Sequence, residues 1–203
     1  MGVLSHLEPK AVFDFFERLC AVPHGSGNTR IISDLCVTMA RELGLRYRQE
    51  DCNNVIIWKD ASPGYESAAP VILQGHMDMV CAQTEDCPKD MTREGLDLAT
   101  DGHYVWAEKT SLGGDDCIAV AAIFAILADD SLPHPPLEAV ITVDEETGMD
   151  PAKAGAYIAS VAMREGHHHP LYAIRFDYKF FTFLAKVLPA RFLNWLIYCL
   201  YGK

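Results

Sequence analysis

The sequence predicts an α/β fold, in which helices flank a mixed, mostly parallel β-sheet and a helical C-terminal tail follows. Two apolar runs, PVILQGHMDMV at 70–80 and LEAVITVDEE at 137–146, are typical of strands buried on both faces of such a sheet. Between them, CIAVAAIFAILADD has the length and apolar character of a buried helix. Strand, helix and strand in this order predict a βαβ unit.

Shorter elements surround this unit. Apolar residues at helical spacing predict one helix over 9–21, with Pro9 in its first turn, and a second over 29–43 that ends at Gly44. Three segments, LRYRQE, NVIIWK and HYVWAE, have the pattern of short strands. PHGSGN and SPGYES are loops by composition.

Charge is distributed unevenly along the 203 residues. Residues 1–150 contain 10 Lys and Arg against 26 Asp and Glu, whereas residues 151–203 contain 7 against 2. The acidic excess argues against a nucleic-acid partner. Seven scattered cysteines without a CxxC pair, and an N-terminus without an apolar signal segment, favour a reduced protein in the cytoplasm.

The change in composition after residue 149 predicts two domains, 1–149 and 150–203. The second is a helical, apolar and basic tail, which Pro189 divides into two pieces. Charged residues interrupt it too often for a membrane-spanning helix. We therefore expect an interfacial helix pair or a docking arm, with the histidines at 167–169 in an exposed loop.

His76 and Asp78 are two residues apart near the carboxyl end of the first apolar strand, so they point to the same face. A histidine with a purely structural role would also fit this pattern. However, ligands of open α/β sheets bind at the carboxyl ends of strands. An Asp beside a metal-bound His can also accept a hydrogen bond from its other ring nitrogen.

Two acidic pairs belong to the same unit of the chain. Asp115 and Asp116 open the apolar helix, where capping of the helix is the ordinary role of such residues. Glu145 and Glu146 end the second apolar strand, where solvation alone would account for them. Taken together with the imidazole, these carboxylates suit zinc or a similar divalent ion. A spare Glu beside the ligands is the general base that metal-assisted hydrolysis requires.

Six stretches extend this pattern over residues 4–149. They are PHGSGNT, NNVIIWKDASPGYE, VILQGHMDMVC, TSLGGDD, PHPPLE and ITVDEETGM. In order and spacing, the sequence resembles the aminoacyl-histidine dipeptidase family (peptidase D, the cytosolic non-specific dipeptidases), within the dizinc aminopeptidase and carboxypeptidase superfamily. The resemblance implies the N-terminal half of a dizinc exopeptidase catalytic domain, which hydrolyses dipeptides of the Xaa-His type with broad specificity.

The resemblance also implies a role for each site residue. His76 would bind one zinc ion, with Asp78 orienting its ring, and Asp115 would bridge two zinc ions. Glu146 would bind the second ion. Glu145 would be the general base that takes a proton from the bridging water.

Several family features have no matching motif here. A further carboxylate ligand, a lid domain and a distant histidine ligand are missing, so each zinc would have two protein ligands and we expect impaired activity. His167–His169 could substitute, although an exposed loop is the alternative. Lys109, Ser111 and Cys117 replace Gly, Thr and Gly of the family, and Cys117 is either tolerated or an additional soft ligand.

The tail is similar instead to the C-terminal end of some short-chain dehydrogenase/reductases, without their glycine fingerprint or Tyr-x-x-x-Lys pair. This predicts a junction between unrelated sequences near 148–151. The alternative function is a non-catalytic module whose tail docks to a membrane surface or a partner protein. Unpaired strand edges would also allow a homo-oligomer.

Overall fold

The computed structural model describes residues 2–147, all of which lie within one compact unit. Several predictions concern residues 150–203: the helical tail, the histidine loop, the docking role and the resemblance to reductases. These, the domain boundary at 149/150 and the junction near 148–151 lie outside the described residues and stay predictions. Within residues 2–147, no helix combines the length and apolar character needed to cross a membrane.

A four-stranded mixed sheet, with the order β1-β2-β6-β3, organises the fold. Its strands are β1 (Arg46–Gln49), β2 (Val55–Lys59), β6 (Leu137–Thr142) and β3 (Val71–His76). β1 pairs with β2 and β2 with β6 in antiparallel fashion, whereas β3 and β6 are parallel. The predicted mixed α/β sheet is thus confirmed, with its parallel part in the β3–β6 pair. A separate hairpin consists of β4 (Leu98–Thr100) and β5 (Val105–Ala107).

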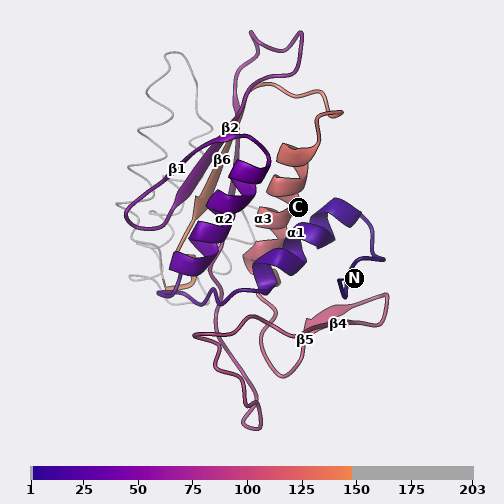
Figure 1. Ribbon diagram of the computed structural model, residues 1–203, viewed down its shortest axis with the longest axis vertical. Coiled ribbons are helices and arrows are strands. Elements are labelled where there is room, and N and C mark those ends of the chain that lie inside the picture. Colours follow the sequence, from indigo (N-terminus) through magenta and orange to yellow (C-terminus); the bar gives the residue numbers. More distant parts are fainter. Residues whose placement is uncertain (1, 148–203) are drawn as a thin grey trace, which may run out of the picture. The chain divides into compact units, whose positions relative to one another are not determined.

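Three helices lie on one side of the sheet (Figure 1). They are α1 (Lys10–Cys20), α2 (Arg30–Glu42) and α3 (Gly114–Ala128), as the helical patterns predict. α2 packs on β1 and β2, α3 packs on β3, and α1 packs against α3. Gly44 follows α2 with φ of +67°, the left-handed conformation that a helix-terminating glycine adopts without steric cost.

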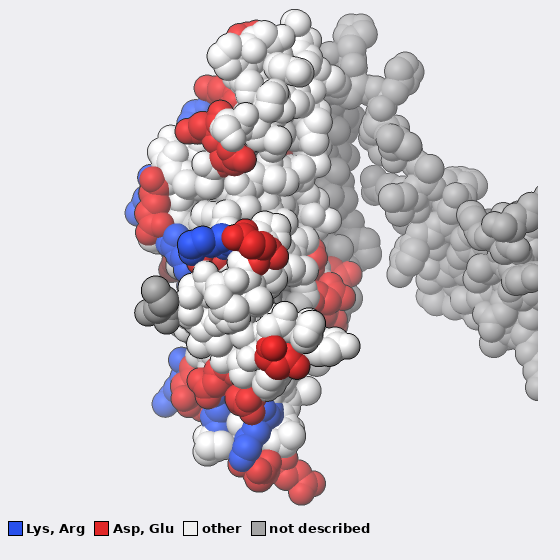
Figure 2. Space-filling model, turned by 90° about the vertical axis from the view of Figure 1, so that its right-hand side faces the viewer, with Lys and Arg blue, Asp and Glu red and all other residues white. Residues whose placement is uncertain are grey.

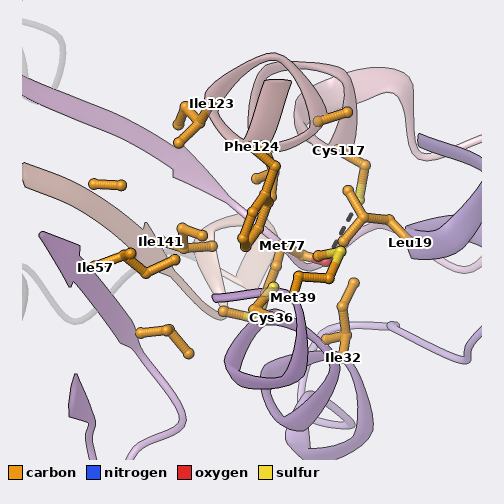
Figure 3. Packing of buried hydrophobic residues seen from close by; sticks show 14 of the residues in the cluster. Leu19, Ile32, Cys36, Met39, Ile57, Met77, Cys117, Ile123, Phe124 and Ile141 are labelled. Carbon is orange, nitrogen blue, oxygen red and sulfur yellow. Dashed lines mark hydrogen bonds between the residues drawn. The ribbon is translucent and has the colours of Figure 1, made fainter. Parts of the chain in front are cut away.

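The core lies between these helices and the sheet (Figure 3). Phe124 of α3 is fully buried, and its ring centroid lies 5.5 Å from that of Phe15 in α1. Alternate residues of β2 and β6, such as Ile57 and Ile141, face the same cluster. Each such side chain contributes about 1.5–3 kcal/mol when it leaves water. The core thereby fixes α3 across the parallel strand pair.

The first apolar strand is not buried on both faces, which corrects the sequence prediction. Val71 and Ile72 of β3 are each 42% exposed, because β3 is the edge strand of the described sheet. Only its carboxyl end is covered, where α3 crosses it. A Cβ atom on Gly75 would lie 3.1 Å from Asp116 Oδ2 and 3.3 Å from Val120 Cγ2, so a glycine permits this close approach.

The βαβ unit itself is confirmed, because α3 connects the parallel neighbours β3 and β6. The second apolar strand is shorter than predicted: β6 ends at Thr142, and a 3₁₀ turn, η1 (Glu145–Thr147), contains the acidic pair. His76 is the register partner of Thr142. The chain segments that follow β3 and β6 therefore leave the sheet at the same end, where the two parallel strands finish.

Candidate metal centre

Three of the predicted site residues meet at this end of the sheet. One ligand atom each of His76, Asp115 and Glu146 lies within 4.8 Å of the other two. They come from the end of β3, the first turn of α3 and the turn after β6. The parallel pairing of β3 and β6 explains the convergence, since it brings two strand ends and one helix start together.

The ring of His76 is buried, and contacts at both of its nitrogen atoms fix its orientation. Its Nδ1 lies 3.0 Å from the carbonyl oxygen of Asp78, and its Nε2 lies 3.2 Å from Asp115 Oδ1. A carbonyl oxygen only accepts hydrogen bonds, so Nδ1 carries a proton. Nε2 therefore faces the carboxylates, with Glu145 Oε2 4.0 Å away. This is the tautomer in which Nε2 can bind a metal ion.

Neighbouring carboxylates shift the pKa values of His76 and Asp116. Burial by itself lowers the pKa of His76, but the charge of Asp78, its carbonyl group and Asp115 together raise it above its ordinary value. Burial raises the pKa of Asp116, and the charge of Asp115 acts in the same direction. The imidazolium is thus favoured while no metal competes for Nε2.

Asp78 is fully buried, and its carboxylate connects two parts of the site. The Ser26 hydroxyl donates to Oδ2 at 2.7 Å, and the amide of Glu145 donates to Oδ1 at 3.2 Å. The amide of Glu146 also donates to Oδ2, at 3.4 Å. The predicted contact with the His76 ring is present, but the carbonyl of Asp78 is closer to Nδ1 than its carboxylate, which lies 3.4 Å away.

The carboxylates on the open side of the site are much more exposed. The side chain of Asp115 is 88% exposed and that of Glu145 is 44% exposed. Asp115 does not cap α3: the N-cap is Gly113, no side chain caps the helix, and Asp115 has non-helical φ and ψ of −89° and 108°. This extended backbone accompanies a side chain directed at His76 instead of at the helix amides.

The loop before α3 tolerates its unusual residues in different ways. Lys109 has φ of +62°, the region that favours glycine, and its Nζ lies 2.7 Å from Asp86 Oδ2. The Ser111 hydroxyl donates to the carbonyl of Val80 at 2.6 Å. Cys117 is fully buried in the core, so it does not belong to the ligand cluster.

The thiol of Cys117 is directed at the carbonyl oxygen of Met77, at a distance of 3.6 Å (Figure 3). Burial, together with the nearby thiols of Cys20 and Cys36, raises its pKa well above the ordinary value. Because only a thiolate binds metal ions well, the structure favours tolerance of Cys117 over a role as a soft ligand.

Sequence reasoning missed two residues that support this site. Ser26 binds Asp78, and Asp144 accepts a hydrogen bond from the amide of Gly27 at 2.6 Å. Asp144 has φ of +60°, which places its side chain over this loop. The available signal was the PHGSGN loop, whose composition indicated only an irregular segment.

The donor set fits a divalent cation. One imidazole nitrogen and two carboxylate oxygens are ligands that zinc accepts, and two ligands on one tetrahedral zinc ion lie about 3.3 Å apart. The 3.2 Å between His76 Nε2 and Asp115 Oδ1 matches this spacing. The 4.8 Å span of the whole set is larger, so Glu146 would have to move inward to hold the same ion as His76 and Asp115.

Comparison with known proteins gives consistent relatives. The chain is 38% identical over 152 residues to the cytosol non-specific dipeptidase of Escherichia coli K12, which covers 75% of this chain and 31% of that protein. The crystal structure of aminoacylhistidine dipeptidase from Vibrio alginolyticus superposes with a TM-score of 0.70 at 38% identity, over 73% of this chain and 30% of that one.

A more distant structure shares the fold alone. A tripeptidase from Staphylococcus aureus is 24% identical, with a TM-score of 0.57 over 71% of this chain and 39% of that chain. No protein-family profile matches the sequence. The chain spans only about a third of the length of its dipeptidase relatives. In sequence and in fold, the matched three-quarters of the chain is similar to the N-terminal part of a protein of the cytosol non-specific and aminoacylhistidine dipeptidases.

Proposed function

We propose that this chain carries a metal-dependent peptidase site for dipeptides of the Xaa-His type, with broad specificity and with Zn2+ as the cation. The observation that carries the proposal is the convergence of His76, Asp115 and Glu146 within 4.8 Å. Its family context supports the reaction class, since the matched relatives are named as dipeptidases.

The ligand roles follow from exposure and donor chemistry. His76 offers Nε2, while Asp115 and Glu146 offer carboxylate oxygens on the solvent side. In a two-ion arrangement Asp115 would be the ligand common to both ions, as the resemblance to the dipeptidase family implies. A bound divalent ion supplies Lewis acidity, which polarises a peptide carbonyl and acidifies water.

Glu145 is the proposed general base. Its half-exposed carboxylate lies beside the ligand cluster, with Oε2 4.0 Å from His76 Nε2, and its backbone is held by Asp78. A carboxylate in this place takes the proton from water as water attacks the peptide carbonyl, and then delivers it to the leaving amine. Asp78 is a positioning residue, because its carbonyl retains the Nδ1 proton of His76.

We expect slow turnover by this chain compared with the Escherichia coli dipeptidase. The described residues supply three ligand atoms, whereas catalytic zinc ions usually have three protein ligands each.

The assay uses the full 203-residue chain, stripped of metal by a chelator and reconstituted with Zn2+. Release of free histidine from Ala-His is measured for the wild type, Glu145→Gln and His76→Ala. We expect Zn2+-dependent hydrolysis that falls at least 100-fold in Glu145→Gln, although this variant still binds Zn2+. His76→Ala should lose both binding and turnover. Equal turnover in wild type and Glu145→Gln, or no bound Zn2+ in the wild type, would refute the proposal.

We also infer that the protein acts in the cytoplasm and does not bind nucleic acid. All six described cysteines are free, and the Escherichia coli relative is named a cytosol enzyme. Acidic side chains form several clusters on the face shown in Figure 2, with basic side chains beside some of them. On this face, the described residues form no continuous basic track for a phosphate backbone. Homo-oligomerisation through unpaired strand edges stays a prediction, as does membrane contact through residues 150–203.

A further inference from the structure

We propose that Ser26 is a positioning residue of this site, which acts through Asp78. Its hydroxyl fixes the carboxylate that in turn holds the acidic turn at Glu145 and Glu146 next to the His76 ring. This inference deepens the proposed function and rests on it for one of the two measurements below.

The hydroxyl of Ser26 has a single proton and a clear choice of acceptor. Asp78 Oδ2 lies 2.7 Å from Oγ, whereas the carbonyl oxygen of Met79 lies 3.3 Å away. Hydrogen bonds from a hydroxyl to a carboxylate are short and about twice as strong as neutral ones. The proton of Ser26 is therefore directed at Asp78.

Asp78 depends on this bond because it is shielded from water. At 0% exposure its two oxygens receive hydrogen bonds from Ser26, Glu145 and Glu146. Without the hydroxyl, Oδ2 retains only the longer bond of 3.4 Å from the Glu146 amide. A buried carboxylate that lacks a donor rotates toward other donors, and the turn it holds moves with it.

The backbone around Ser26 keeps its hydroxyl in place. The amide of Ser26 donates to the carbonyl of Met79 at 3.2 Å, and the amide of Met79 donates to the carbonyl of His24 at 3.1 Å. On the other side, the amide of Gly27 donates to Asp144 Oδ1 at 2.6 Å. The loop thus binds both segments that follow the parallel strands.

Gly25 allows this loop to approach so closely. A Cβ atom at this position would lie 2.5 Å from Cys81 Sγ, which is far inside van der Waals contact. Ser26 follows this glycine directly and binds Asp78, which is 52 residues away in sequence. A side chain at position 26 that only filled space would need neither the close packing at Gly25 nor a hydroxyl group directed at Asp78.

Ser33 offers a matched control for a purely structural serine. It is also buried, and its hydroxyl donates to the carbonyl of Asn53 at 2.7 Å. It belongs to α2 and makes its described hydrogen bonds with Asn53, Gln49 and the backbone of Thr29. Ser33→Ala therefore removes a buried hydroxyl without touching Asp78.

The experiment compares the full chain with Ser26→Ala, Ser26→Thr and Ser33→Ala. Amide hydrogen exchange at residues 145 and 146 is first measured by NMR in metal-free protein. The dissociation constant for Zn2+ is measured second. We expect Ser26→Ala to exchange about 10-fold faster at both amides and to bind Zn2+ at least about 10-fold more weakly. Ser26→Thr should restore both values, because it retains the hydroxyl.

The outcomes separate this inference from the proposed function. Ser33→Ala should lower the free energy of unfolding but leave exchange at residues 145 and 146 unchanged. If Ser26→Ala behaves like Ser33→Ala at these amides, Ser26 is not a positioning residue and the inference is overturned. If the wild type binds no Zn2+ while Ser26→Ala still accelerates exchange, the proposed function fails and the positioning role of Ser26 stands.

Discussion

The two sides of the metal centre contrast in burial. His76 and Asp78 are 6% and 0% exposed, whereas the side chains of Asp115 and Glu145 are 88% and 44% exposed. On the buried side, polar groups must have protein partners, so hydrogen bonds fix their geometry before any ligand arrives. On the exposed side, water satisfies the carboxylates, which are free to adjust to a cation. The buried residues of the site therefore contribute to the stability of the fold, whereas the exposed carboxylates can adjust their positions to a cation.

The largest expected effect comes from Asp78→Asn. An amide provides one acceptor where the carboxylate provides two, so at least one buried donor loses its partner. We expect the free energy of unfolding to fall by about 2–3 kcal/mol in metal-free protein and Zn2+ affinity to fall by about 100-fold. Urea denaturation and titration calorimetry measure the two quantities.

Asp144→Asn is the matched control for that substitution. Asparagine tolerates the left-handed backbone at this position and keeps an acceptor for Gly27, so the unfolding free energy should change by less than about 0.5 kcal/mol. A wild-type stability for Asp78→Asn would show that the buried side is not fixed by this carboxylate.

Asp115→Asn tests the exposed side. Its solvated carboxylate contributes to cation binding and hardly to folding, so Zn2+ affinity should fall by about 10- to 100-fold at unchanged stability. Asp60→Asn, whose side chain is 93% exposed and pairs with Arg46, is the control and should alter neither quantity. A stability loss above about 1 kcal/mol in Asp115→Asn would break the contrast between the two sides.

Cys117→Ala asks whether the core side of α3 contributes to the metal centre. Removal of the buried Sγ leaves a small cavity and should cost about 1 kcal/mol of unfolding free energy. Zn2+ stoichiometry and affinity should match the wild type, because the thiol faces Met77. A drop in affinity of 10-fold or more would make Cys117 a ligand after all.

The smallest effect concerns His24, a buried histidine whose backbone carbonyl accepts a hydrogen bond from the amide of Met79. Burial lowers its pKa below the ordinary value of 6.5. The His24 imidazole therefore binds a proton more readily in the unfolded chain than in the folded protein. As a result, the free energy of unfolding decreases as pH falls below about 6.5. Between pH 7 and pH 6 this loss is less than about 1 kcal/mol.

The His24→Gln variant isolates this contribution. Glutamine does not titrate, so the stability of the variant should fall less steeply than that of the wild type between pH 7 and pH 5. His76 acts in the opposite direction, because its raised pKa adds stability at low pH, but it does so equally in both proteins. Parallel pH profiles from thermal unfolding would contradict a neutral, buried His24.

Much of the fold was predictable because its determinants are local. The helical spacing of apolar residues identified α1, a second periodic segment ending at Gly44 identified α2, and length and apolar character identified α3. The exposure of Val71 and Ile72 was not predictable, since an apolar strand does not reveal which neighbours it has. The end of β6 at Thr142 was missed for a similar reason: acidic residues continue a strand pattern or start a turn according to their partners.

The candidate site divides in the same way. The spacing of His76 and Asp78 and the two acidic pairs indicated a metal centre from residue types alone. The contact between His76 and Asp115 and the hydrogen bond from Ser26 to Asp78 join distant segments of the chain. No local pattern encodes such contacts.

The sequence by itself determined the three described helices, five of the six described strands and the chemical types of the site residues, because propensity and periodicity act over neighbouring positions. Tertiary structure decided which of those residues meet. The parallel register aligns His76 with Thr142, and hydrogen bonds across 52 and 117 residues join the Ser26–Gly27 loop to Asp78 and Asp144. The physical reason is that burial leaves a polar group only the partners that the packed strands bring to it.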